Sequence, residues 1–139
     1  MSPFVWQVRV YWEDTDAGGI VFYANYLRFL ERARTEWLRA HGIAQRELAR
    51  EAGVIFSVVA LEVQYRRPAR LDDLLGVSCE PAREGGASLL FAQRIWLVGK
   101  ESETLLQARV RVASLHAASL KPRRLPQVIV EKLSDQRSI

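Results

Sequence analysis

Two acidic residues stand where an alternating segment of the chain gives way to a long amphipathic one. Asp14 and Asp16 occur in the run Asp14-Thr15-Asp16-Ala17-Gly18-Gly19. The glycine pair supplies the backbone freedom for a turn, and a helix that starts beyond it presents unpaired amides and the positive end of its dipole. A group held at this junction would therefore face donors that favour negative charge. Aspartates are also ordinary turn residues, so the pattern alone is compatible with a purely structural role.

The segments on either side of the turn show different periods. Before it, Val8, Val10 and Trp12 alternate with polar residues, which predicts a strand that continues through Trp12. After it, apolar residues recur at helical spacing and charged residues cover the opposite face, which predicts a helix from about Ala24 to His41 that ends before Gly42. The apolar stripe consists of Tyr26, Phe29, Leu30, Ala33 and Trp37.

The remainder of the chain is dominated by strand patterns. A short helix over residues 44–52 should end at Gly53, and strands are expected over residues 59–66, 75–79, 89–98 and 105–115. Pro81 to Gly86 reads as a turn, and residues 128–133 read as a last short helix with Pro126 near its first turn. The predicted fold class is α+β, with an antiparallel sheet of five to six strands wrapped around one long central helix in a single domain over residues 1–139.

Composition excludes several classes of protein. The net charge of +4 is modest and spread along the chain, so a nucleic-acid module is the least expected function. The sequence contains no apolar run long enough to span a bilayer and no signal peptide pattern, so we expect a cytoplasmic protein. The lone Cys79 agrees with a reducing compartment, and its position in a strand pattern predicts a buried cysteine rather than a nucleophile.

Other catalytic and metal-binding patterns fail on spacing. Asp14-x-Asp16 begins like a calcium loop, but the next ligand position falls on Gly18 and the bidentate glutamate position falls on Asn25. We therefore expect no metal. The chain also lacks a G-x-S-x-G serine, a phosphate-binding glycine motif and zinc spacing. His41 is expected to contact the last carbonyls of its helix, and His116 has no acidic or cysteine partner at useful spacing.

At the level of motifs, the chain resembles the hotdog-fold acyl-CoA thioesterases of the 4-hydroxybenzoyl-CoA thioesterase type, and most closely their bacterial Tol-Pal-associated branch. The matching residues are Tyr11-x-x-Asp14-Thr15-Asp16-Ala17-Gly18-Gly19-x-Val21-x-Tyr23-Ala24-x-Tyr26, Glu31-Arg32-Ala33-Arg34, Tyr65-x-x-Pro68-Ala69-Arg70-Leu71-Asp72-Asp73-Leu74, Gly86-x-Ser88-x-x-Phe91-x-Gln93-Arg94-Ile95 and Lys121-Pro122-Arg123. The similarity extends over nearly the whole chain. The first of these motifs is specific, because an acid, a turn and a helix start occur together.

The resemblance implies roles for two residues at the turn. Asp16 matches the catalytic carboxylate of the family, which acts on the thioester carbonyl either as a nucleophile or as a base for water. The backbone N–H of Tyr23 matches the amide that polarises this carbonyl. Many members of this branch have His at the position of Tyr23. The exchange is harmless if the backbone acts alone, and it alters activity if an imidazole assists.

The resemblance also suggests how the substrate is bound. The residues that we assign to binding of acyl-CoA are Gly19, Val21, Asn25, Arg66, Arg67, Arg70 and Ser88. The arginines lie near strand ends, where the phosphates of coenzyme A could reach them. Ser88 lies near the expected path of the pantetheine. Asn25 could instead cap the helix, and Asp14 is expected to bind backbone amides in the turn.

Together, these features predict an acyl-CoA thioesterase that releases a free acid and coenzyme A. No cofactor is expected, because water and a carboxylate suffice. Exposed sheet edges favour pairing between two copies, and the resemblance implies an active site at the interface of a homodimer or homotetramer. The alternative is a non-catalytic module or scaffold of the same fold that binds acyl-CoA or acyl carrier protein. Another hotdog enzyme, the hydratase, uses an Asp and His pair that is absent from this sequence.

Overall fold

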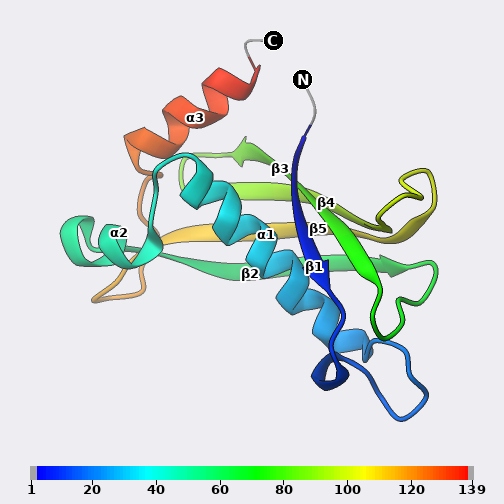
Figure 1. The fold of residues 1–139 in the computed structure, drawn as a ribbon. Helices are drawn as coiled ribbons and strands as arrows, with labels where there is room; N and C mark the ends of the chain where they lie inside the picture. The colour runs from blue at the N-terminus through cyan, green and yellow to red at the C-terminus, as the bar shows by residue number, and fades with distance from the viewer. Residues whose placement is uncertain (1–2, 138–139) are drawn as a thin grey trace.

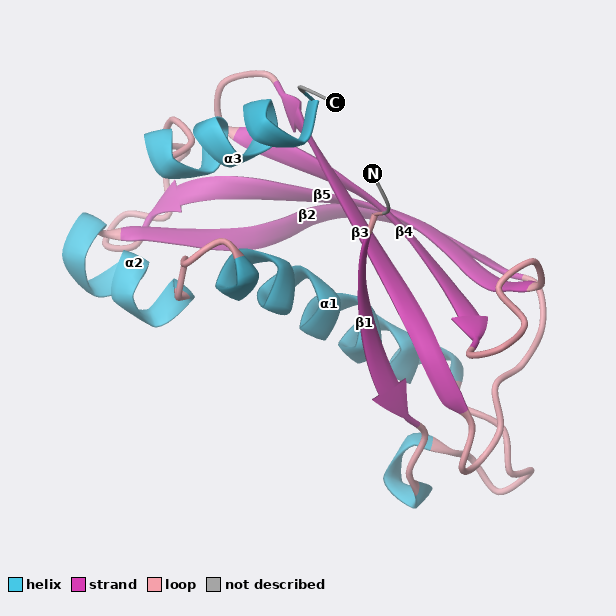
Figure 2. Ribbon diagram, turned by 45° about the horizontal axis from the view of Figure 1, so that its top comes forward, coloured by secondary structure: helices cyan, strands magenta, loops and turns pink. Residues whose placement is uncertain are grey.

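A five-stranded antiparallel sheet curves over one long helix. The computed structural model describes residues 3–137. The strands β1 (Phe4–Arg9), β2 (Val54–Tyr65), β3 (Leu74–Glu84), β4 (Ser88–Leu97) and β5 (Thr104–His116) lie in the order β1-β3-β4-β5-β2. The helix α1 (Tyr26–Ala40) packs against one face of this sheet (Figures 1 and 2). The predicted α+β class, with its sheet around a central helix, is confirmed.

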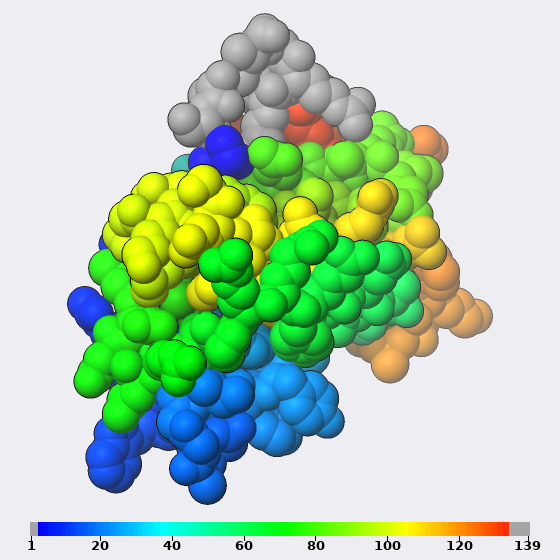
Figure 3. Space-filling view, turned by 90° about the vertical axis from the view of Figure 1, so that its right-hand side faces the viewer, coloured from blue at the N-terminus to red at the C-terminus, as the bar shows by residue number. Residues whose placement is uncertain are grey.

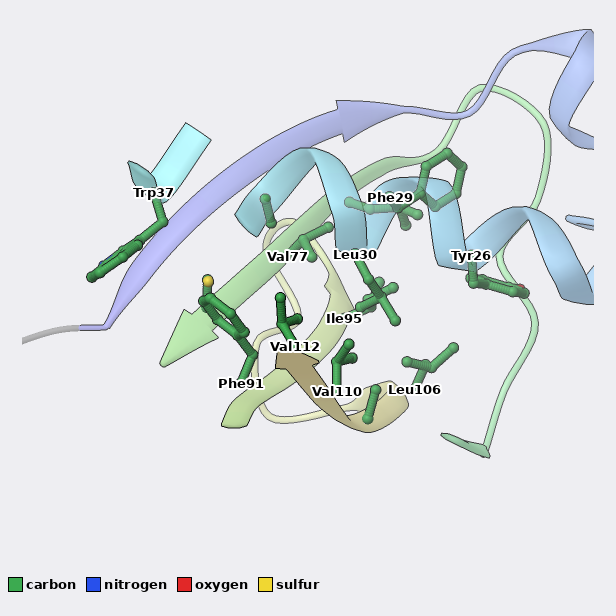
Figure 4. Close-up of a cluster of buried hydrophobic side chains, with 14 of the residues drawn as sticks. Tyr26, Phe29, Leu30, Trp37, Val77, Phe91, Ile95, Leu106, Val110 and Val112 are labelled. Atoms are coloured by element: carbon green, nitrogen blue, oxygen red, sulfur yellow. The ribbon is translucent and has the colours of Figure 1, made fainter. Parts of the chain in front are cut away.

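Helix α1 supplies the centre of the core because its apolar stripe is buried as the spacing predicts. Phe29, Leu30, Ala33 and Trp37 have no exposed surface, and Tyr26 is 3% exposed. Their side chains point toward β3, β4 and β5, where they meet residues such as Val77, Phe91 and Val110 (Figure 4). Each large side chain that is buried in this way stabilises the fold by roughly 1.5–3 kcal/mol.

Two smaller helices lie near the end of α1 that is remote from the turn. Helix α2 (Gln45–Ala52) ends at Gly53, whose φ of 65° is the left-handed conformation that the predicted stop requires. Helix α3 (Gln127–Arg137) starts directly after Pro126, as predicted, and buries Ile129 and Leu133. The 10–25 segment and α3 therefore lie at opposite ends of α1 (Figure 1). No helix among the described residues is long and apolar enough to cross a bilayer.

Several strand boundaries differ from those that the sequence predicts. The first strand does not continue through Trp12. The chain leaves the sheet after Arg9, forms a 3-10 turn over Trp12–Asp14, and leaves Trp12 80% exposed. The strand ends early because the carboxylate of Asp14 accepts a hydrogen bond from the amide of Tyr11 at 2.8 Å and closes the turn.

The second difference concerns Pro81, which lies inside β3 rather than in a turn. Proline cannot donate to a ladder, but it is tolerated at a sheet edge. Strand β1 pairs with β3 only as far as Phe4 opposite Cys79, so β3 is an edge strand at Pro81. The turn follows at Gly85, and β3 with β4 and β5 forms the predicted antiparallel meander. Strand β2 is also longer than predicted, because it begins at Val54.

Candidate active site

The acidic turn is a small hairpin between the end of the first strand and α1. Thr15 and Val21 form a bridge, and the amide of Asp16 donates to the carbonyl of Ile20 at 2.9 Å. The amide of Gly19 in turn donates to the carbonyl of Asp16 at 3.0 Å. Gly19 has a φ of +81°, a conformation that side-chain-bearing residues rarely adopt. The glycine pair therefore closes a hairpin whose first tip residue is Asp16.

The carboxylate of Asp16 is exposed and only partly engaged. Its Oδ1 accepts a hydrogen bond from the amide of Gly18 at 2.8 Å. Its Oδ2 has no hydrogen-bond partner in the part of the chain that the structure describes. A Cβ atom on Gly18 would lie 3.2 Å from Oδ1, so the glycine allows the carboxylate to fold back over the turn. One oxygen is thus oriented by the backbone while the other can accept a proton or attack a ligand.

Asp14 has the structural role that the sequence suggests. It is 5% exposed, and its carboxylate bonds the amide of Tyr11. Its carbonyl accepts from the amide of Phe22 at 2.9 Å and from the side-chain amide of Asn25 at 3.0 Å. The proposed capping role of Asn25 is wrong, since its side chain makes no capping bond and instead ties the helix start to Asp14.

The start of α1 presents two backbone donors without acceptors. A 3-10 turn over Tyr23–Asn25 leads into the helix. Among the described residues, no acceptor is bonded to the amide of Tyr23 or to that of Ala24. The first four amides of a helix lack partners inside it, and here neither side chain nor backbone replaces them at these two positions. The arrangement leaves donors available at the positive end of the helix dipole.

The hairpin that carries Asp16 returns the chain to the helix start, because Thr15 bridges Val21 and the amide of Phe22 donates to the carbonyl of Asp14. The pKa of the Tyr26 hydroxyl is raised, mainly by burial, and the nearby charge of Asp16 is among the further causes. The same hydroxyl accepts a hydrogen bond from the amide of Ala69 at 3.0 Å, which acts in the opposite direction. The charge of Asp16 has the smallest of these effects on the pKa of the Tyr26 hydroxyl, after burial, Ala69, Tyr65 and Asp73.

Gly19 and Val21 pair with the loop that follows β2. The amide of Val21 donates to the carbonyl of Ala69 at 2.9 Å, Ile20 bridges Arg70, and the carbonyl of Gly19 accepts from Leu71. In the space-filling view, the blue surface of the turn and helix start lies directly against the green surface around residues 60–75 (Figure 3). The side chain of Val21 is 3% exposed and forms part of the core, so its accessible contribution to a ligand is confined to its backbone.

The predicted coenzyme A residues fall into two groups. Arg66 and Arg67 lie just beyond β2, where Arg66 bonds Gln107 at 2.9 Å and Arg67 forms an exposed ion pair with Glu103 at 3.5 Å. Arg70 is exposed beside the Asp16 hairpin. Ser88, by contrast, begins β4 opposite Glu84, whereas the loop near Arg70 adjoins the other end of that strand. Within one chain, the structure places Arg70 beside the Asp16 hairpin, whereas the side chains of Arg66 and Arg67 bond residues of β5 and of the turn before it, and Ser88 lies apart.

Two cavities lie elsewhere on the chain. One, of about 500 Å³, opens on the sheet face turned away from α1, with Arg94, Trp96 and Arg109 in its walls. The other, of about 290 Å³, lies between α1 and the sheet, with Arg34 and Phe91 in its walls. Asp16 lines neither of these two cavities, and its side chain is exposed in the single chain.

Cys79 and His41 both have surroundings that indicate structural roles. Burial raises the pKa of the Cys79 thiol to about 12, so this cysteine is a poor nucleophile, as its strand position predicts. His41 contacts the carbonyl of Trp37 at 2.8 Å through Nδ1, at the end of α1 as expected. The described residues contain no group of three or more His, Cys, Asp or Glu side chains that could hold a metal ion.

Sequence reasoning missed the contact made by Tyr65. Its hydroxyl donates to the carbonyl of Tyr23 at 2.9 Å and thereby joins the end of β2 to the first turn before α1. Tyr65 is the first residue of the motif that runs to Leu74, but nothing in the spacing of that motif indicates a backbone carbonyl 42 positions away as its partner. Only the folded chain reveals the contact.

A curved sheet around a central helix, with an acidic turn at the helix start, defines the class of hotdog thioesterases. The thioesterase superfamily model matches residues 18–103. The chain belongs to the thioesterase superfamily.

Particular relatives extend the match over nearly the whole chain. The acyl-CoA thioester hydrolase YbgC of Escherichia coli O6:H1 is 49% identical over 127 residues, which are 91% of this chain and 92% of the relative. The acyl-CoA thioesterase YbgC of Haemophilus influenzae is 43% identical and covers 92% of each chain. The 1,4-dihydroxy-2-naphthoyl-CoA thioesterase Slr0204 from Synechocystis has the same fold, with a TM-score of 0.90 at 19% identity, over 99% of this chain and all of that one.

Proposed function

We propose that this protein is a cytoplasmic acyl-CoA thioesterase of the 4-hydroxybenzoyl-CoA thioesterase type, from the Tol-Pal-associated branch. One observation carries the proposal: the carboxylate of Asp16 keeps a free oxygen beside a helix start whose Tyr23 amide has no acceptor in the described structure. The names of the two YbgC relatives support acyl-CoA as the substrate. A buried, unreactive Cys79 agrees with the reducing conditions of the cytoplasm.

The proposed reaction uses water and the residues of this chain. The N–H of Tyr23 donates to the thioester oxygen and stabilises the negative charge that develops on it. One such donor can lower the activation barrier by about 3 kcal/mol. Asp16 either takes a proton from the attacking water or attacks the carbonyl carbon itself. If Asp16 acts as the base, water adds to the carbonyl carbon, the carbon–sulfur bond breaks, and the thiolate gains the proton that Asp16 took from water. If Asp16 attacks, the carbon–sulfur bond breaks as an anhydride forms between Asp16 and the acyl group, and water then hydrolyses this anhydride, which releases the free acid, restores the carboxylate and supplies the proton for the thiolate.

We further propose that the site is completed by a second copy of the chain. Strand β2 is an edge of the described sheet, and its Val58, Val59 and Leu61 side chains are 43–57% exposed. Unpaired edges and exposed apolar residues both favour pairing with another chain. A homodimer, or a tetramer of two dimers, would enclose the open surface beside Asp16. Gly19, Val21, Asn25, Arg66, Arg67, Arg70 and Ser88 are the proposed contacts to acyl-CoA.

The alternative is a module that binds acyl-CoA or acyl carrier protein without hydrolysing it. The observation that favours it is the absence of Asp16 from the walls of both cavities described above. The two functions differ in one measurable product, because only the enzyme releases a thiol.

Thiol release from short, long and aromatic acyl-CoAs distinguishes the two functions. The native protein should hydrolyse at least one of them, and Asp16→Asn should lower kcat by about 10³-fold, within the range for loss of a general base. The melting temperature should stay unchanged, because the carboxylate is exposed and its single hydrogen bond can be kept by the amide oxygen. Near-native hydrolysis by Asp16→Asn would refute the site. Binding without thiol release by the native protein would favour the module.

A further inference from the structure

Tyr65 connects the edge of the sheet to the proposed reaction centre. It is the last residue of β2, and its side chain is half exposed. Its hydroxyl donates a 2.9 Å hydrogen bond to the carbonyl oxygen of Tyr23. The first turn before α1 is therefore tied, through this hydroxyl, to a strand that follows it by about forty residues. The proposed catalytic amide belongs to the same residue whose carbonyl is held.

The carbonyl that Tyr65 holds is part of the peptide group between Tyr23 and Ala24. The two peptide planes on either side of Tyr23 carry the N–H groups of Tyr23 and of Ala24, neither of which has an acceptor among the described residues. The hydrogen bond to the carbonyl holds the second plane, which carries the N–H of Ala24, and anchors the backbone of Tyr23 beside it. A hydrogen bond accepted by the carbonyl also polarises its peptide group, which makes the N–H of Ala24 a stronger donor.

The side chain of Tyr65 is itself held in place. Its ring packs edge-on against the ring of Tyr26, with 5.7 Å between centroids and 64° between planes. Tyr26 is buried and accepts a hydrogen bond from the amide of Ala69, so it forms a fixed support. The Tyr65 hydroxyl is protonated at neutral pH because the ordinary pKa of tyrosine is about 10, and desolvation raises this pKa further. The hydroxyl is therefore a positioned donor.

We infer that Tyr65 is a positioning residue for thioester hydrolysis, which acts by orienting and polarising the backbone donors at the start of α1. The inference rests on the proposed function, because orienting the backbone of Tyr23 and polarising the N–H of Ala24 affect the reaction only if the amides at this helix start bind the thioester oxygen. Tyr65 forms no bond with the substrate in this scheme. Its effect is exerted on the stability of the charge that develops at the carbonyl oxygen, and so on kcat rather than on binding.

The direct test is Tyr65→Phe, which removes one oxygen and keeps the ring that packs on Tyr26. We expect kcat for the best acyl-CoA of the thiol-release panel to fall about tenfold, while KM and the melting temperature stay close to native values. The matched control is Ser119→Ala, which also removes a hydroxyl bonded to a backbone group, an amide 3.3 Å away, in an exposed turn. This control should retain native kcat.

A spectroscopic measurement separates positioning from a merely structural role. The same acyl-CoA, with ¹³C at its carbonyl, is bound to Asp16→Asn, which slows turnover and leaves the backbone donors in place. Hydrogen bonds to the carbonyl lower its stretching frequency, so Asp16→Asn should show a lowered value. The double variant Asp16→Asn with Tyr65→Phe should show a value shifted back toward that of free acyl-CoA.

The possible outcomes decide the inference and the proposed function separately. Native kcat and an unchanged carbonyl frequency in the Tyr65→Phe proteins would overturn the inference, even where Asp16→Asn is inactive. A lower melting temperature or higher KM at native kcat would also overturn it, since that pattern indicates a structural contact. Full activity of Asp16→Asn would instead refute the proposed function, whatever Tyr65→Phe does.

Discussion

Polar groups gather at two places along α1, under its middle and in the turn before its first residue, and the two places differ in their hydrogen bonding. Under its middle, the 3% exposed Gln93 donates from Nε2 to the carbonyls of Leu30 at 3.0 Å and Ser78 at 3.3 Å. Its Oε1 accepts from Arg34 at 3.0 Å. At the start of the same helix, the amides of Tyr23 and Ala24 have no acceptor within the described residues. The side chain of Gln93 is hydrogen-bonded through both its nitrogen and its oxygen, whereas the two amides at the helix start are not.

The difference follows from access to solvent. A buried polar group without a partner costs about 1–3 kcal/mol, so the polar cluster under the middle of α1 must be complete. Burial lowers the pKa of the Arg34 guanidinium, which reflects the cost of holding that charge there. The helix start is exposed, so water can satisfy its donors until a ligand displaces it. The contacts of Gln93 therefore contribute to stability, whereas exposed donors beside a carboxylate oxygen without a partner can bind a ligand.

Among the variants that test this comparison, Tyr23→Pro should have the largest effect, a fall in kcat. Proline has no N–H, and at the first position of a helical turn it otherwise fits. The preceding Phe22 has φ of −62° and ψ of 131°, the extended conformation that proline favours in its predecessor. The variant should fold and lose about 10²-fold in kcat, measured by thiol release, because a donor to the developing oxyanion is missing.

Tyr23→Phe is the control for this variant, because it changes the side chain and keeps the backbone. Its kcat should stay within about twofold of native if the amide alone acts on the carbonyl. A large loss in Tyr23→Phe would show that the phenol takes part, and native activity in Tyr23→Pro would exclude the amide.

A smaller effect is expected from Gln93→Leu, and it should appear in stability rather than in activity. The substitution preserves side-chain size but leaves Arg34 and the carbonyls of Leu30 and Ser78 without their partner. The free energy of unfolding in urea should fall by about 2 kcal/mol, whereas kcat per folded molecule should be native. Gln7→Leu is the control, since Gln7 is exposed on β1, and should change stability by no more than about 0.5 kcal/mol. Loss of kcat in fully folded Gln93→Leu would contradict the division between the two regions.

The motif residues were easier to foresee than the contacts around them. The long helix and the stop at Gly53 follow from spacing and from a left-handed position that glycine favours. The end of the first strand does not, because it depends on a hydrogen bond from Tyr11 to the Asp14 side chain. Likewise, Pro81 fits inside β3 only because β1 stops opposite Cys79, which a local pattern cannot reveal. At the candidate site, the contact of Tyr65 could not be predicted for the same reason, since its partner is a backbone atom that the tertiary structure brings to it.

The smallest expected effect tests how closely the free carboxylate is oriented. In Gly18→Ala, the added Cβ would lie 3.2 Å from Oδ1 of Asp16, closer than ordinary contact, so the carboxylate must move by a few tenths of an ångström. We expect kcat to fall about tenfold, which corresponds to about 1.4 kcal/mol, with a melting temperature within about 2 °C of native. Gly86→Ala is the control, because its Cβ would meet no atom within 4 Å among the described residues, and it should retain native kcat. Native kcat in Gly18→Ala would mean that Asp16 acts from a conformation other than the one bonded to the Gly18 amide, and the site would then have to form only when substrate or a second chain reorders the hairpin.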